Sequence, residues 1–214
     1  MDDELFRDRT DAGRRLAERL LEYESRGAVV LAIPRGGVPV GFEVAKRLNA
    51  RFDVIIPRKI PIPWNPEAGF GAITADGTMV LNENMVRSLD LSEEEIQQAA
   101  EEVRREIIRR ASEYRADRPP EDVKGRSVIV VDDGLASGYT MLAAIESLRK
   151  HEPSGIVVAV PVASAGAARL VAPKADKLVA LIISGRLPFA VAEFYMQWRD
   201  LTDQEVVGYL KIST

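Results

Sequence analysis

Short apolar runs that alternate with helix-length segments constrain the fold of this sequence more than any other feature. The predicted strands are short and, apart from Asp53 in the second, apolar; they cover residues 28–33, 52–57, 128–131, 156–160 and 178–183. Segments with helical periodicity are found at 5–23, 38–48, 138–150 and 164–172. Because apolar strands joined by helices are typical of parallel sheets covered on both faces, we predict an α/β fold.

Residues 60–125 interrupt this alternation. The proline-rich stretch 60–68 predicts a loop, and Asp76-Gly77 between apolar stretches predicts the turn of a β-hairpin. Ser92 and Glu95 have the spacing of a capping box, which predicts the start of a long helix that ends near Tyr114. We interpret 60–125 as an insertion in one domain that covers residues 1–214.

Composition limits the classes of function. The formal charge of −4 argues against broad electrostatic binding of nucleic acid, and the absence of cysteine excludes disulfides and thiolate metal sites. No apolar run approaches the roughly 20 residues that cross a bilayer, and the acidic first residues are unlike a secretory signal. We therefore expect no membrane partner and a cytoplasmic location.

Val128–Thr140, which reads VIVVDDGLASGYT, is the most informative segment. Asp132 and Asp133 follow a predicted strand, at the edge where ligands bind in open parallel sheets. Small residues and a helix start come next, so backbone N–H groups and the hydroxyls of Ser137 and Thr140 can surround an anion. A simple turn would explain Asp-Asp-Gly alone, but the residues on both sides of it favour a phosphate site.

Two carboxylates beside a phosphate site indicate a ligand with two chemical ends. Phosphate fits the loop, whereas vicinal hydroxyls donate hydrogen bonds to carboxylates, which can also hold Mg²⁺ directly or through water. A phosphorylated ribose has both ends. The sequence has neither a Walker loop nor a complete GxGxxG pattern, so the commonest nucleotide-binding motifs are absent.

The segment VIVVDDGLASGYT resembles the PRPP-binding motif of type I phosphoribosyltransferases. The resemblance implies their fold, a three-layer α/β/α sandwich with a mostly parallel sheet, a flexible loop within 60–125 and a C-terminal hood at 185–214. It also implies PRPP and a nucleobase as partners, Mg²⁺ as cofactor, release of pyrophosphate, and commonly a homodimer. The whole arrangement most resembles a subgroup of bacterial and archaeal members whose substrate is poorly defined.

The resemblance implies roles for individual residues. Asp132 and Asp133 would fix the ribose hydroxyls and Mg²⁺. The 5-phosphate would lie on Leu135, Ala136, Ser137, Gly138, Tyr139 and Thr140. The pyrophosphate would contact Arg35, Gly36 and Gly37 after the first strand, and Arg58 and Lys59 at the end of the second. Arg35 and Lys59 are expected to act in catalysis, with the two acids, because they would stabilise the leaving group.

The flexible loop departs from the family pattern. Orotate phosphoribosyltransferases have a lysine in this loop, but no Lys or Arg occurs between Ile60 and Leu81. Tyr114 and Arg115, at the far end of the predicted long helix, are candidate substitutes. The end of a charged helix explains these two residues equally well.

Aromatic residues concentrate at 188–201, after the last predicted strand. Phe189, Phe194 and Trp198 are candidates for stacking on a base, with Glu193 as a polar contact, and a closing hydrophobic cluster is the alternative. Lys174 and Glu193 are similar to base-reading residues of hypoxanthine-guanine enzymes only over short segments, so surface positions are the preferred interpretation. His151, the one histidine, is expected at a helix C-terminus without a catalytic role.

Three functions stay open on the sequence. The first is a phosphoribosyltransferase that acts on a purine or pyrimidine base. The second is a non-catalytic PRPP-binding regulator, against which the acidic composition weighs when the regulator needs a nucleic-acid surface. The third is a PRPP or ribose-phosphate hydrolase on the same fold.

Overall fold

The computed structural model describes residues 5–116 and 118–212, apart from the Glu67 side chain. Its central sheet has five parallel strands in the order β2-β1-β6-β7-β8. Their bounds are Val29–Ala32 for β1, Arg51–Val54 for β2, Ser127–Val131 for β6, Gly155–Ser164 for β7 and Lys177–Ser184 for β8. All five predicted strands are therefore present, although β2 ends earlier and β7 continues further than predicted.

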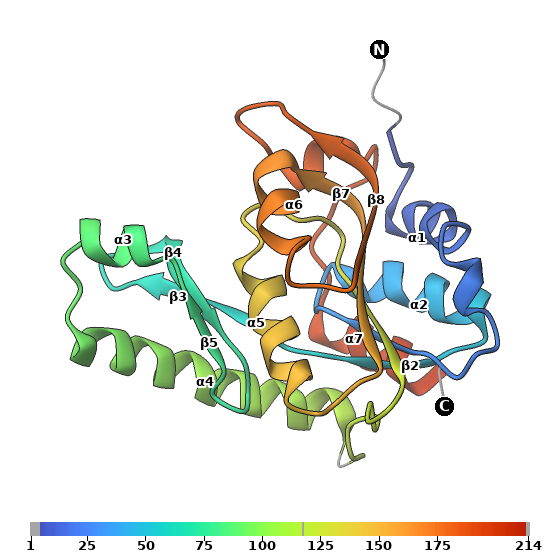
Figure 1. Cartoon of the computed structure of the whole chain (residues 1–214), viewed down its shortest axis with the longest axis horizontal. Coiled ribbons are helices and arrows are strands. Elements are labelled where there is room, and N and C mark those ends of the chain that lie inside the picture. Colours follow the sequence, from blue (N-terminus) through green and yellow to red (C-terminus); the bar gives the residue numbers. More distant parts are fainter. Residues whose placement is uncertain (1–4, 117, 213–214) are drawn as a thin grey trace.

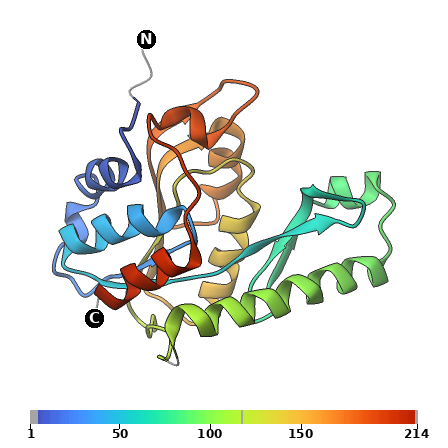
Figure 2. The ribbon, with the colours of Figure 1, turned by 180° about the vertical axis from the view of Figure 1, so that it is seen from behind.

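Helices cover both faces of this sheet because successive strand residues point to opposite sides. Val30, Ala32 and Val131 belong to the core under α1 (Arg9–Ala17) and α2 (Gly37–Leu48). Val29, Leu31 and Val130 belong to the core under α5 (Tyr139–Arg149) and α6 (Ala165–Val171). Figures 1 and 2 show the two helix pairs on opposite sides of the sheet, which is the predicted three-layer arrangement.

Residues 58–115 form an arm that extends from one end of the molecule (Figure 1). It contains the antiparallel strands β3 (Arg58–Ile62), β4 (Asn65–Ile73) and β5 (Met79–Leu81), followed by α3 (Glu83–Ser88) and α4 (Glu93–Arg115). The prediction of a loop at 60–68 is wrong, because most of this stretch lies in β3 and β4. Pro61 is tolerated because β3 is an edge strand whose pairing is irregular at that residue.

Helix α4 gives the arm its core. Ser92 and Glu95 form the predicted capping box, so the predicted start of the helix is confirmed. Ile96, Ala100 and Ile107 are buried on one face of α4, in the same cluster as Ile60 and Phe70 of the arm sheet. Their spacing of four and seven residues is the helical period, which the mixed charges of the segment had obscured.

The remaining elements are short. The predicted helix at 5–23 is confirmed only in part, because α1 ends at Ala17 and a 3₁₀ turn, η1, covers Leu21–Tyr23. A second 3₁₀ turn, η2, covers Val191–Phe194, and α7 covers Asp203–Ile212. Within the described ranges, no helix combines the length and apolar character needed to cross a membrane.

Asp76 fixes the predicted turn between β4 and β5. Its carboxylate accepts hydrogen bonds from the Thr74 hydroxyl, from the Thr78 backbone N–H at 3.1 Å and from the Thr78 hydroxyl at 2.8 Å. Partial burial acts to raise the pKa of Asp76, but the bonds from Thr74 and Thr78 outweigh it and hold the pKa well below its usual range.

We expect Asp76→Ala to destabilise the chain by about 1–2 kcal/mol at pH 7, because two threonine hydroxyls lose their acceptor. The folded pKa of Asp76 lies below its unfolded value of about 3.9, so its stabilisation is complete at neutral pH and declines as the pH falls through that value. Urea unfolding at pH 7 and pH 3 should show a smaller difference in the free energy of unfolding between wild type and variant at pH 3 than at pH 7. A constant difference would contradict the role of the charge.

Candidate functional site

The acidic segment and the Arg35 loop meet where β1 and β6 end. The two strands are adjacent and parallel, and the Ile33 N–H donates a hydrogen bond to the Val131 carbonyl at 2.8 Å. A cavity of about 380 Å³ lies here; we call it the β1/β6 cavity. Its lining includes Arg35, Gly36, Arg58, Lys59, Asp132, Asp133 and Thr140 from the predicted set, together with Ile33, Pro34, Ile56, Pro57 and Arg110.

The two loops touch so closely that Gly36 and Gly37 have no room for a side chain. A Cβ on Gly36 would lie 1.9 Å from Oδ2 of Asp133. A Cβ on Gly37 would lie 2.8 Å from the Val131 carbonyl oxygen and 2.9 Å from Cα of Asp132. The glycines therefore let the Arg35 loop lie directly against the acidic segment.

Asp133 is held by residues from both ends of the chain. Its Oδ2 accepts a hydrogen bond from Nε of Arg9 at 2.8 Å, and both side chains are nearly buried. The Arg9 guanidinium also donates to the Arg199 carbonyl at 2.8 Å and lies 3.8 Å from the centre of the Trp198 ring. The Tyr195 hydroxyl donates to the Asp133 carbonyl at 2.6 Å. Arg9 could not be predicted as a site residue, because no local pattern marks a contact over such a distance in sequence.

The two acids lie in a region that disfavours negative charge. Burial raises the pKa of Asp132 well above its ordinary value, and the neighbouring Asp133 carboxylate raises it further. Burial also raises the pKa of Asp133, although Arg9 acts in the opposite direction. A cation or a pair of hydroxyl donors would therefore stabilise the ionised acids.

The loop after the acids is anchored to β7 through Leu135. The Leu135 N–H donates to the Val162 carbonyl at 2.9 Å, and its side chain is buried, so its N–H is not available to a ligand. Gly138 caps α5 with a φ of 86° and no side-chain hydrogen bond closes the cap. Because the first N–H groups of a helix lack partners within it, residues 136–140 are the part of the loop that can surround an anion.

Arg58 and Lys59 line the β1/β6 cavity, but they belong to β3 and not to the predicted second strand. Strand β2 ends at Val54, and the two residues begin β3 at the base of the arm. Nη1 of Arg58 is 3.4 Å from Oε1 of Glu106 on α4. Burial lowers the pKa of Arg58, and the nearby charge of Arg110 lowers it further.

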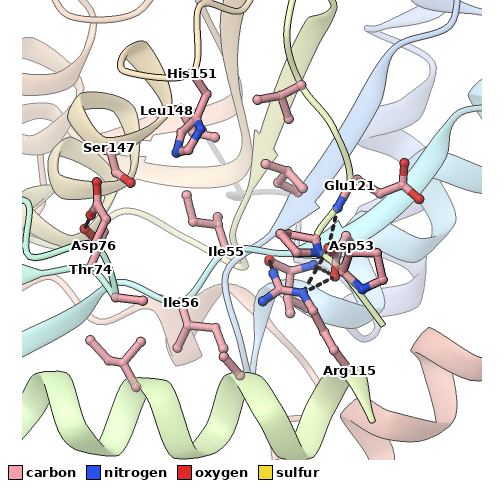
Figure 3. Close-up of a pocket in the computed structure, with 18 of the residues that line it drawn as sticks. Asp53, Ile55, Ile56, Thr74, Asp76, Arg115, Glu121, Ser147, Leu148 and His151 are labelled. Atoms are coloured by element: carbon pink, nitrogen blue, oxygen red, sulfur yellow. Dashed lines mark hydrogen bonds and ion pairs between the residues drawn. The ribbon is translucent and has the colours of Figure 1, made fainter. Parts of the chain in front are cut away.

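Arg115 does not line the β1/β6 cavity, and Figure 3 shows its side chain directed toward Asp53. Its guanidinium lies 3.1 Å from Oδ2 of Asp53 and 2.6 Å from the Val54 carbonyl oxygen. These residues line a separate cavity of about 460 Å³. Ile56 lines both this cavity and the β1/β6 cavity, and the exposed His151 lines only the separate one. Tyr114 is buried and donates its hydroxyl to Asp203. Arg115 and Tyr114, the two candidate substitutes for a loop lysine, therefore both have other partners in the structure.

The residues proposed for the base differ in exposure. Phe194 is buried, and its ring centre lies 5.6 Å from that of the half-buried Phe189. Trp198 is 40% exposed and stacks on Arg9, so it is linked through Arg9 to Asp133. Glu193 and Lys174 are exposed. Part of the aromatic set thus belongs to the core, and Trp198 presents the most open ring.

A divalent cation fits this site only with help from a ligand. Among the residues that the structure describes, no three His, Cys, Asp or Glu side chains gather as a metal site. Asp132 and Asp133 could bind Mg²⁺ if the substrate supplied further oxygens, since Mg²⁺ commonly binds through one or two carboxylates and substrate phosphates.

Comparisons with known proteins agree with this geometry. Residues 74–197 match the model of the phosphoribosyl transferase domain. Two Mycobacterium tuberculosis proteins, each named "Putative phosphoribosyl transferase", are 42% identical over 96% of this chain, which spans only 46% of their length. A crystal structure of a Thermus thermophilus protein aligns with a TM-score of 0.80 and 39% identity, over 96% of this chain and 97% of the other.

The domain match covers more than half of the chain, including the acidic segment and the loop that follows it. The five-stranded parallel sheet, with helices on both faces and a small antiparallel sheet beside it, has the architecture expected for this domain. The chain therefore belongs to the phosphoribosyl transferase domain family.

Proposed function

We propose that the chain is a Mg²⁺-dependent phosphoribosyltransferase that transfers the 5-phosphoribosyl group of PRPP to a nucleobase and releases pyrophosphate. The observation that supports this most is the meeting of three ligand-binding features in one cavity. These are the acids Asp132 and Asp133, the start of α5, and the cations Arg35, Arg58 and Lys59. They match the ribose hydroxyls, the 5-phosphate and the pyrophosphate of PRPP.

In this proposal each group of residues has one task. Residues 136–140 bind the 5-phosphate, and this remote binding energy orients C1 of the ribose. Asp132 and Asp133 accept hydrogen bonds from the ribose hydroxyls and favour positive charge on the sugar as the bond to pyrophosphate breaks. Arg35 and Lys59 stabilise the negative charge that develops on the leaving group. Bound Mg²⁺, held by the two acids and by PRPP oxygens, would add to that stabilisation.

The acceptor is the least constrained part of the proposal. Trp198 offers an exposed ring near the acids, and planar bases stack on such rings. The curated relatives are about twice as long as this chain, so their activity as whole proteins does not define its substrate. A purine or a pyrimidine remains compatible with the site.

Pyrophosphate release from PRPP and Mg²⁺ across a panel of purine and pyrimidine bases tests the proposal. We expect release to depend on one base or on a small group of related bases, with the matching nucleoside monophosphate as product. Tight PRPP binding without turnover would instead indicate a regulator. Release of pyrophosphate and ribose 5-phosphate without any base would indicate a hydrolase.

A further inference from the structure

Arg110 of α4 lies in the β1/β6 cavity, although no sequence pattern distinguishes it from the other charged residues of the helix. Its side chain is 20% exposed and lines the cavity together with Arg35, Arg58 and Lys59. It also lines an adjoining cavity of about 440 Å³ between β3 and α4. Because 60–81 contains no Lys or Arg, the cations that the arm presents to the β1/β6 cavity are Arg58, Lys59 and Arg110.

Arg110 and Arg35 converge on one carboxylate oxygen. Nη1 of Arg110 and Nη1 of Arg35 each lie 3.8 Å from Oδ1 of Asp203, the first residue of α7. Helix α7 contacts α4 here, and the Tyr114 hydroxyl donates to the same Asp203 oxygen. At 3.8 Å the arginine contacts are ion pairs longer than hydrogen bonds, so a stronger anion could replace Asp203 between the two guanidinium groups.

The surrounding charges also favour an added anion. Among the described residues, Arg35, Arg58 and Arg110 pair with only two carboxylates, Glu106 and Asp203, and Glu106 also pairs with Arg109. Glu106 is shared, because its Oε1 lies 2.8 Å from Arg110 Nε and 3.4 Å from Arg58 Nη1. Burial lowers the pKa of Arg58, and the charges of Arg110 and Arg35 add to that effect. A multiply charged group such as pyrophosphate would relieve this repulsion.

We propose that Arg110 binds the pyrophosphate group of PRPP together with Arg35, at the place that Asp203 occupies between them. This inference rests on the proposed function, since it concerns the same ligand. It makes α4 part of the binding site, so the arm contributes a cation from a helix rather than from its hairpin. Without a ligand, the hydrogen bond from Tyr114 to Asp203 ties α7 to α4.

Arg110→Gln tests the role, with Arg109→Gln as the matched control. Arg109 is the preceding residue of α4, is half exposed, and pairs with Glu106 and Glu113 without lining the β1/β6 cavity. Calorimetric titration would measure binding of PRPP with Mg²⁺, of inorganic pyrophosphate, and of ribose 5-phosphate, which lacks the pyrophosphate. We expect Arg110→Gln to weaken the affinity for PRPP and for pyrophosphate by about tenfold to a hundredfold. The affinity for ribose 5-phosphate should fall by less than about twofold. Arg109→Gln should change none of them by more than about twofold.

Two further variants cover the case in which Arg110→Gln folds poorly. Arg110→Lys keeps a charge beside Glu106 but loses the fork of donors, so we expect intermediate affinity for pyrophosphate. Asp203→Asn removes the competing charge and should tighten pyrophosphate binding by about threefold or more. Equal loss of PRPP and ribose 5-phosphate in Arg110→Gln, or unchanged pyrophosphate affinity in both Arg110→Lys and Asp203→Asn, would overturn the inference. If the wild type itself binds no PRPP, the proposed function fails instead.

Discussion

Asp132→Asn is expected to reduce PRPP turnover by about 100-fold or more while leaving the chain at least as stable as the wild type. Asn keeps the shape of the side chain and can still accept a hydrogen bond from the Asp133 N–H, which donates to Asp132 Oδ1 at 2.8 Å. It cannot supply the charge that the ribose hydroxyls, the cationic sugar and Mg²⁺ require. The variant therefore separates the function of this residue from its place in the fold.

The expected gain in stability follows from the direction of the pKa shift. Burial and the neighbouring Asp133 raise the pKa of Asp132 in the folded chain above its unfolded value. The ionised form therefore weakens the fold at pH 7, and this cost disappears below about pH 4, where Asp132 is protonated in both states. Thermal unfolding without ligand should show Asp132→Asn melting at or above the wild-type temperature at pH 7, with the difference lost at low pH.

Asp133→Asn is the informative comparison. It should also lose turnover, but it weakens the pairing with the nearly buried Arg9, so we expect Asp133→Asn to be less stable than Asp132→Asn. A site residue without structural partners would lose activity with little loss of stability, and the Arg9 contact changes that expectation for Asp133. If Asp132→Asn kept full turnover, or if it destabilised the chain as much as Asp133→Asn, the assignment of Asp132 to the ribose would be wrong.

Much of the fold could be predicted because its signals are local. Each central strand lies in a mainly apolar run, and the residues of β1, β6 and β7 are mostly buried, whereas β8 at the edge of the sheet is partly exposed. The arm was harder, because the proline-rich stretch gives the local signal of a loop. It forms strands only because α4 covers Ile60 and Phe70 from a position far along the chain.

The site shows the same division between local and distant contacts. Asp132, Asp133, Arg35 and Gly36 could be predicted because each follows a strand, and adjacent parallel strands bring their ends together. Arg9 and Arg110 could not, because their neighbours in sequence look like ordinary charged helix surface. Their positions depend on how α1 packs near Trp198 and how α4 passes beneath the cavity, which are tertiary contacts without a sequence pattern.

Gly36→Ala is expected to lower PRPP affinity and turnover by about 100-fold through contact with Asp133 alone. The backbone at Gly36 has φ of −61° and ψ of −36°, which alanine adopts without strain. The added Cβ, however, would lie 1.9 Å from Asp133 Oδ2 and 2.5 Å from its Cγ. Since Arg9 holds that carboxylate, either Asp133 leaves Arg9 or the Arg35 loop moves away from β6. Gly208→Ala in α7, where nothing lies within 4 Å of the added atom, is the control and should be neutral or stabilising.

A double-variant cycle shows whether the contact with Asp133 is the cause. Asp133→Ala removes the carboxylate that the Gly36→Ala methyl would strike, so the double variant should lose less stability than the two single losses together, by about 1 kcal/mol or more. Turnover should stay low in all three variants, because the double variant restores space but not the acid. Additive stability losses in urea unfolding would show that Gly36 is needed for another reason. A large interaction energy between positions 36 and 133 would mean that the small size of Gly36 positions the acidic segment as well as leaving room for a bound pyrophosphate. The Arg35 loop and the acids would then reach their positions only together.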